Sequence, residues 1–115
     1  EPTAGLDSTS AAQLLTLLNQ LNAAGMTLAF STHDVELAWQ LADDIALFKD
    51  GRCLQQGAPE ALLADRTALA EVGLEPPLVL EIALAARAQG LISPHAPLPR
   101  DRHTLLAQMA QAPRR

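Results

Sequence analysis

The sequence predicts an α/β fold that continues into a helical C-terminal extension. Helix and strand patterns alternate over the first half of the 115 residues, an Asp-Gly turn then marks a hairpin, and alanine- and leucine-rich helices follow. Such an alternation implies a partly parallel sheet that finishes in an antiparallel hairpin. We therefore expect an α/β part over residues 1–65 and a helical extension over residues 66–115.

The first half opens with a helix over residues 9–24, because apolar side chains recur there at three- and four-residue steps. Asp7 or Ser8 can cap the start of this helix. Residues 26–31 are short and apolar enough for a buried strand. The apolar face expected for the helix consists of Ala11, Leu14, Leu15, Leu18 and Leu21.

A second helix is expected over residues 34–43, with Asp34 as its N-cap. Its single tryptophan, Trp39, is interpreted as a packing anchor rather than a partner contact. The residues expected on the apolar face of this helix are Val35, Ala38, Leu41 and Ala42.

The remaining elements are a hairpin and three further helices. Strands over residues 44–49 and 52–56 are joined by Asp50-Gly51, the strongest local hairpin signal in the chain. The helices are expected over residues 60–65, 78–89 and 103–111. In the longest of them, one face carries Leu78, Ile82 and Ala85.

Composition excludes several classes of protein. Hydrophobic residues make up 49% of the chain, which excludes intrinsic disorder, and no apolar run reaches the length of a membrane span. The net charge is −5, with −8 over residues 1–99 and +3 over residues 100–115, and aromatic residues make up only 3%. These values argue against a nucleic-acid-binding surface. The single cysteine, Cys53, fits a reducing compartment.

Candidate chemistry gathers at one predicted edge of the sheet. Glu1 would end a strand that lies mostly before this chain, Asp7 begins a helix, and His33 follows the strand predicted over 26–31. Sites in open α/β sheets form outside the carboxyl ends of strands. The alternative is structural: Asp7 is only a helix cap, and His33 is satisfied by local backbone.

Three segments in order carry a family resemblance: Glu-Pro-Thr-Ala-Gly-Leu-Asp, Ser-Thr-His-Asp, and Asp-Gly-Arg-Cys-Leu-Gln-Gln-Gly. Together they closely resemble the ATPase subunits of ABC transporters over residues 1–57. The segment over residues 72–79 is similar to the cobalt- and nickel-type energy-coupling-factor branch. The resemblance implies the C-terminal part of a P-loop NTPase domain, and a first residue other than Met agrees with a chain cut from a longer protein.

The resemblance also implies roles for individual residues. Glu1 corresponds to the catalytic acid after the Walker B strand, which polarises the attacking water, and His33 corresponds to the switch histidine that contacts the γ-phosphate. Ser8 departs from the family, in which proline is common at this position. The D-loop, which crosses the interface between two ATPase subunits, corresponds to Ala4, Gly5, Leu6 and Asp7.

Other family motifs do not occur in this sequence. The phosphate loop, the signature sequence and the Walker B aspartate are missing, so ATP and Mg²⁺ would be bound mainly by residues outside this segment. The implied partners are a second ATPase subunit and a transmembrane coupling subunit, with no nucleic acid. The implied place is the cytoplasmic face of the membrane, where hydrolysis would power import of cobalt, nickel or a related micronutrient.

Several other functions remain open. Residues 66–115 could form a non-catalytic helical module for dimerisation or regulation, or the ATPase could import another solute. A relative acting in DNA repair or translation would share Glu1 and His33 but would show basic surfaces or long coiled coils. No metal site is expected, because Cys53, His95 and His103 match no compact ligand spacing.

Overall fold

The computed structural model describes residues 2–111 of the chain. These residues form two compact units, one ending at His33 and the other beginning at Asp34. This division differs from the domain boundary that the sequence predicts between residues 65 and 66. That boundary stays a prediction about the intact protein.

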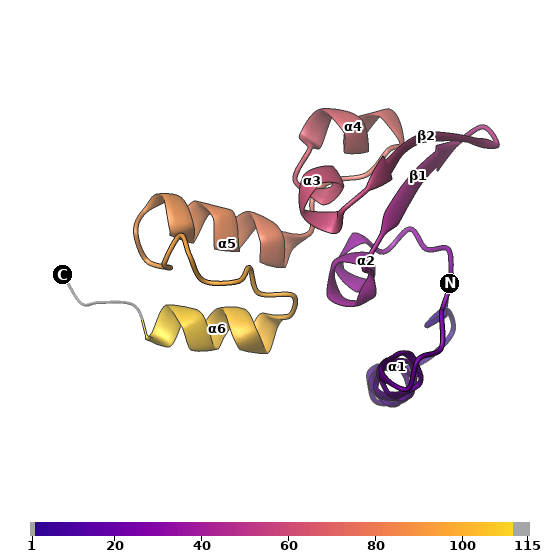
Figure 1. Ribbon diagram of the computed structural model, residues 1–115, viewed down its shortest axis with the longest axis horizontal. Helices are drawn as coiled ribbons and strands as arrows, with labels where there is room; N and C mark the ends of the chain where they lie inside the picture. Colours follow the sequence, from indigo (N-terminus) through magenta and orange to yellow (C-terminus); the bar gives the residue numbers. More distant parts are fainter. Residues whose placement is uncertain (1, 112–115) are drawn as a thin grey trace. The chain divides into compact units, whose positions relative to one another are not determined.

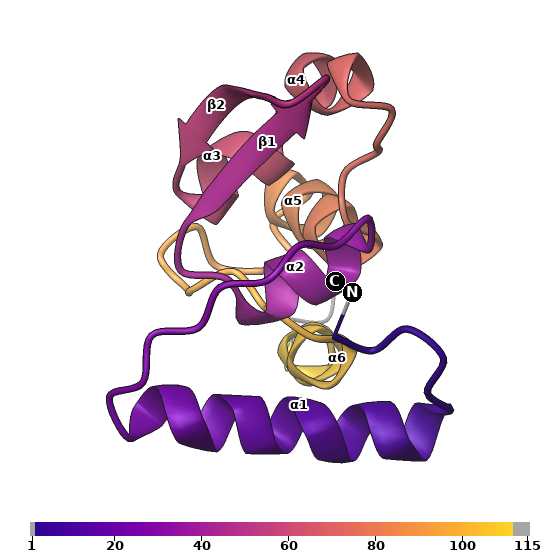
Figure 2. The same cartoon turned by 90° about the vertical axis from the view of Figure 1, so that its right-hand side faces the viewer.

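The first unit consists of a helix, α1, between a tight turn and an extended segment. α1 runs over Ser8–Ala23, as the leucine spacing predicts, and Figure 2 shows it as one uninterrupted helix. No residue of α1 is buried. Its whole predicted apolar stripe is half-buried: Ala11, Leu14, Leu15, Leu18 and Leu21.

The strand predicted over residues 26–31 is wrong for the described chain. This segment has no strand hydrogen bonds, although the backbone of Met26 bonds back to Leu21 at 3.1 Å. A strand exists only beside a neighbour that accepts and donates its backbone hydrogen bonds. No described residue pairs with this segment, so the expected parallel sheet is absent from residues 2–111.

The second unit is built around a two-stranded sheet with helices on both sides of it in the sequence (Figure 1). The elements before the hairpin's end are α2 (Val35–Leu41), β1 (Ile45–Lys49) and β2 (Arg52–Gly57). The helices that follow are α3 (Pro59–Leu63), α4 (Arg66–Glu71), α5 (Leu78–Ala88) and α6 (Arg102–Ala110). All of them except α4 lie within about two residues of the range that the sequence predicts, at the precision of such boundaries. No separate range was predicted for α4, which lies in the alanine- and leucine-rich part of the chain.

The hairpin confirms the prediction made from Asp50-Gly51. β1 and β2 are antiparallel, and both turn residues have positive φ, 52° at Asp50 and 75° at Gly51. These angles match the two-residue turn whose twist suits adjacent strands, and they explain the glycine at the second position. One irregularity in the register follows Leu47, which is paired with Gln55 while Phe48 is paired with Cys53.

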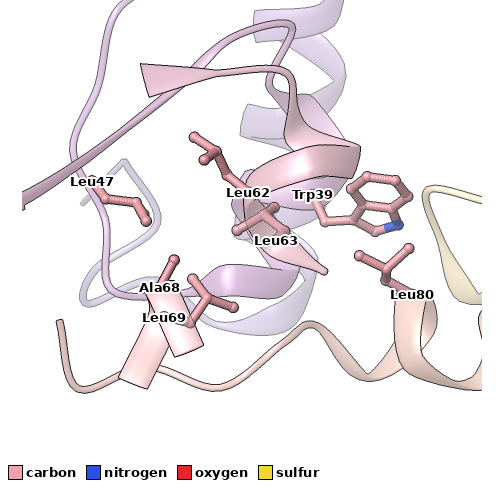
Figure 3. Packing of buried hydrophobic residues seen from close by; sticks show 7 residues of the cluster. All are labelled: Trp39, Leu47, Leu62, Leu63, Ala68, Leu69 and Leu80. Atoms are coloured by element: carbon pink, nitrogen blue, oxygen red, sulfur yellow. The ribbon is translucent and has the colours of Figure 1, made fainter. Parts of the chain in front are cut away.

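One hydrophobic cluster joins the hairpin to the helices before and after it. Figure 3 shows its side chains converging from α2, β1, α3, α4 and α5. The cluster therefore crosses the boundary expected at residues 65 and 66, and the helices beyond it are part of the core. Its buried members are Trp39, Leu47, Leu62, Leu63, Ala68, Leu69 and Leu80.

One predicted helix face is incomplete and another is wrong. α2 buries Leu37 and Trp39, which the prediction omitted, while the expected residues are half-buried and one of them, Ala38, packs against the core cluster. α5 buries Leu80, Ala83 and Ala86 and leaves the face of Leu78, Ile82 and Ala85 exposed. Both faces are apolar in sequence, so periodicity alone does not decide which one meets the core. The prediction of Trp39 as a packing anchor is confirmed, since its exposed fraction is 0%.

Candidate functional site

The segment before α1 is a tight turn that leads into a helix cap. Gly5 has φ +75°, and the backbone N–H of Leu6 donates to Thr3 at 3.2 Å. An L side chain would be strained at that φ, so glycine is the natural residue at this bend. Ala4, Leu6 and Asp7 are exposed, and the exposed fraction of Leu6 is 44%.

Asp7 is the N-cap of α1. The backbone N–H of Ser10 donates to the Asp7 carboxylate at 2.7 Å. That hydrogen bond, followed by one from the Ser10 side chain, lowers the pKa of Asp7 from its ordinary value of 3.8. The capping role anticipated from the sequence is thus confirmed, and the role of Asp7 in a subunit interface stays a prediction.

The lowered pKa makes a testable statement about pH. A carboxyl whose pKa falls on folding contributes stability above its unfolded pKa and loses that contribution as the pH falls through the folded one. We expect the NMR chemical shift of the Ser10 amide proton to follow the protonation of Asp7, with a midpoint below pH 3.8. Asp7→Asn should abolish this pH dependence while keeping a capping oxygen. Asp101→Asn, at the equivalent cap of α6, should leave the pH dependence of the Ser10 shift unchanged, and a wild-type midpoint at or above pH 3.8 would contradict the lowered pKa of Asp7.

His33 is the last residue of the first unit, and Asp34 follows it as the N-cap of α2. The carboxylate of Asp34 accepts hydrogen bonds from the backbone N–H groups of Glu36 at 3.0 Å and Leu37 at 3.1 Å. His33 is exposed. A histidine side chain can donate a hydrogen bond from a ring N–H.

Glu1 lies outside the described residues. Whether Glu1 shares an edge with His33 therefore stays a prediction, as do the roles of Ala4, Gly5, Leu6 and Asp7 at a subunit interface. The described residues contain no group of three or more His, Cys, Asp or Glu side chains that could hold a metal ion. Cys53 is exposed.

The sequence reasoning missed one constellation in the second unit. Trp39 donates a hydrogen bond to Pro99, and the guanidinium of Arg100 stacks on the indole. The only signal in the sequence is an arginine directly after a proline-rich segment, together with a single tryptophan. Such a signal does not identify the two residues as partners, because 60 positions separate Trp39 from Pro99.

Comparison with known proteins decides the family. Over all 115 residues the chain is 57% identical to the cobalt import ATP-binding protein of Rhodobacter capsulatus, of which it spans 41%. The chain belongs to the ABC transporter ATP-binding proteins. It is also 38% identical, over 94 residues, to an energy-coupling factor transporter ATP-binding protein of Methanospirillum hungatei, covering 82% of this chain and 24% of that protein. No family model matches the chain.

A third ABC transporter relative follows the same pattern. The energy-coupling factor transporter ATP-binding protein of Methanocaldococcus jannaschii is 39% identical over 82 residues, which is 71% of this chain and 29% of that protein. The chain spans less than half the length of the curated relatives it matches. Among the described helices of this ABC-family chain, none combines the length and apolar character that a bilayer crossing needs.

Proposed function

We propose that this chain is the C-terminal part of an ATP-binding subunit that hydrolyses ATP to power import of cobalt, nickel or a related micronutrient. The observation that carries the proposal is the 57% identity, over the whole chain, to a protein named for cobalt import. The segments around Gly5 and His33 support it, because they resemble two functional loops of the family. The intact subunit would adopt the P-loop NTPase fold.

The half-buried apolar stripe of α1, in the first unit, supports the proposal of a P-loop NTPase fold. The apolar stripe of α1 is half-buried along its whole length, and no α1 residue is buried. A helix of an α/β domain buries its apolar stripe against a sheet. We propose that the missing strands, to which residues 26–31 would add one, belong to the remainder of the subunit.

In the proposed mechanism this chain supplies a carboxylate and an imidazole. Phosphoryl transfer depends on positioning and charge stabilisation rather than on covalent chemistry by the protein. Glu1 would orient the attacking water, and His33 would donate a hydrogen bond to the transferring phosphoryl group. The turn around Gly5 and the cap at Asp7 would hold the D-loop at the interface with a second ATPase subunit.

Magnesium would take most of its ligands from another part of the subunit. The described residues contain no cluster of His, Cys, Asp or Glu side chains that could hold a metal ion. ATP and Mg²⁺ would be held mainly by residues outside this chain. The further partner would be a transmembrane coupling subunit, at the cytoplasmic face of the membrane.

The test compares the intact subunit with the 115-residue chain. The intact subunit, assembled with its coupling partner in vesicles, is expected to hydrolyse ATP and to accumulate radioactive Co²⁺ or Ni²⁺ only when ATP is supplied. The isolated chain is expected to show neither ATP hydrolysis nor tight ATP binding, because it lacks a phosphate-binding lysine loop. ATP turnover by the isolated chain would contradict this account. If the intact subunit drives uptake of another solute but of neither metal, the proposed substrate is wrong and the proposed ATPase activity stands.

A further inference from the structure

The chain between α5 and α6 is a proline-rich strap, defined here as residues 93–100. Three of its carbonyl oxygens accept hydrogen bonds from side chains of three different helices. Arg87 of α5 donates to Ala96 at 2.9 Å, and Gln108 of α6 donates to Pro97 at 3.0 Å. The third donor is the indole of Trp39 in α2, which reaches Pro99 at 2.8 Å. Because prolines lack a backbone N–H, the strap cannot form the regular backbone hydrogen bonds of a strand. Its carbonyl groups accept hydrogen bonds from side chains instead.

The junction between the strap and α2 is reciprocal. While Trp39 donates to the backbone of Pro99, the side chain of Arg100 donates to the backbone carbonyls of Trp39 at 3.0 Å and Ala42 at 3.1 Å. The guanidinium carbon also lies 4.3 Å from the centre of the Trp39 ring. The exposed fraction of Trp39 is 0%, and Pro99 is likewise fully buried. A stacked, doubly hydrogen-bonded arginine in a partly buried site holds its partner in one geometry.

Arg100 donates hydrogen bonds to backbone carbonyl groups at the C-terminal end of α2. The last four carbonyls of a helix have no partner within it; Trp39 lies in the last turn of α2, and Ala42 is its C-cap. A cation there also complements the negative end of the helix.

The opposite end of α2 is held by α5. The side chain of Glu36, in the first turn of α2, accepts a hydrogen bond from the backbone N–H of Leu78. Leu78 begins α5, whose N-cap Pro77 makes no side-chain capping bond. Residues that follow the hairpin therefore hydrogen-bond to α2 near both of its ends: Leu78 near the start, and Arg100 near the end.

We propose that Arg100 is a positioning residue for the proposed ATPase: it holds α2 against the strap, and the N-cap of α2, Asp34, directly follows His33 in the chain. The link is covalent, because His33 directly precedes Asp34, the N-cap of α2. This inference rests on the proposed function. It adds that the helical extension is a working part of the phosphate-sensing element, with Trp39 and Glu36 as its contacts on α2.

The experiment uses the intact subunit assembled with its coupling partner. Arg100→Ala is expected to lower kcat for ATP hydrolysis about tenfold, because a displaced reacting group costs rate steeply. The KM for ATP and the number of nucleotides bound per subunit should stay unchanged, since the phosphate-gripping residues lie elsewhere. Arg100→Lys keeps the charge but not the planar fork, and should recover part of the lost kcat. Arg102→Ala is the matched control: it removes the same charge from an exposed residue two positions away and should leave kcat unchanged.

Each outcome decides the proposal. A wild-type kcat in Arg100→Ala overturns it, and so does a fall in kcat that is matched by an equal loss of bound nucleotide, which would mark a purely structural role. If Arg100→Ala does not fold, Trp39→Phe takes its place, because it keeps an aromatic ring at this position and removes the N–H that reaches Pro99. A lower kcat at unchanged nucleotide binding then supports the proposal, and an unchanged kcat overturns it. An unaltered intact subunit without ATP hydrolysis would instead overturn the proposed function, and this inference with it.

Discussion

Replacing His33 with alanine in the intact subunit is expected to lower kcat for ATP hydrolysis by about a hundredfold or more, the usual cost of losing one preorganised donor to a developing charge. His33 is exposed at the end of the first unit and would contact the γ-phosphate. Its loss should therefore act on the chemical step and leave ATP binding largely intact. Steady-state kinetics together with equilibrium nucleotide binding would separate the two effects.

Glu1→Gln should have a comparable effect for a different reason. The amide keeps the shape of the side chain but cannot polarise water as a carboxylate does, and general-base catalysis commonly contributes about a hundredfold or more. For His33→Ala, the matched control is His95→Ala, because His95 is an exposed histidine of the second unit. This control should leave kcat unchanged. Near-normal turnover in His33→Ala or in Glu1→Gln would remove that residue from the mechanism.

Truncation after Gly57 is expected to unfold the hairpin and α2. The deleted part supplies most of the core cluster, including Leu63, Leu69 and Leu80, and leaves Trp39 without its packing partners. A two-stranded hairpin is marginally stable at best without such a layer. Circular dichroism and thermal unfolding of the truncated chain should show no cooperative transition. A truncated chain that still unfolds cooperatively would favour the alternative, in which residues 66–115 are a separate module for dimerisation or regulation.

Two leucines of α5 turn this expectation into a graded test. Leu80 is fully buried beside the indole of Trp39 (Figure 3), whereas 63% of Leu78 is exposed. Leu80→Ala should lower the free energy of unfolding by about 3 kcal/mol through lost burial and the cavity left behind. Leu78→Ala, the same substitution on the same helix, should change it by less than about 0.5 kcal/mol. Similar losses at both positions in denaturant titrations would contradict the packing described here.

Local signals in the sequence were sufficient for most elements. Asp7 and Asp34 cap the helices that they were expected to cap, and Asp50-Gly51 makes the predicted turn. These features depend on neighbouring residues only, so the chain carries the information within a few positions. Helix caps and two-residue turns are therefore readable without a partner sequence.

Features that depend on distant partners were not readable in the same way. Residues 26–31 have strand composition but no neighbouring strand among the described residues, so composition alone misplaced a strand there. On α5, both the face of Leu80 and the face of Leu78 are apolar, and only contact with Trp39 and Leu63 selects the first. The candidate site divides likewise: the motifs name Glu1 and His33, but the prediction that they meet depends on neighbouring strands that are absent from residues 2–111.

The buried junction at Trp39 also gives the chain an optical property. Trp39 is the single tryptophan of the sequence, its indole is sealed from water, and a guanidinium lies against its face. Emission from such a fluorophore is blue and inaccessible to collisional quenchers, and it shifts to the red when solvent reaches the ring. The lock between strap and helix thus carries its own spectroscopic label, and in the isolated chain its opening can be followed in real time without attaching a dye.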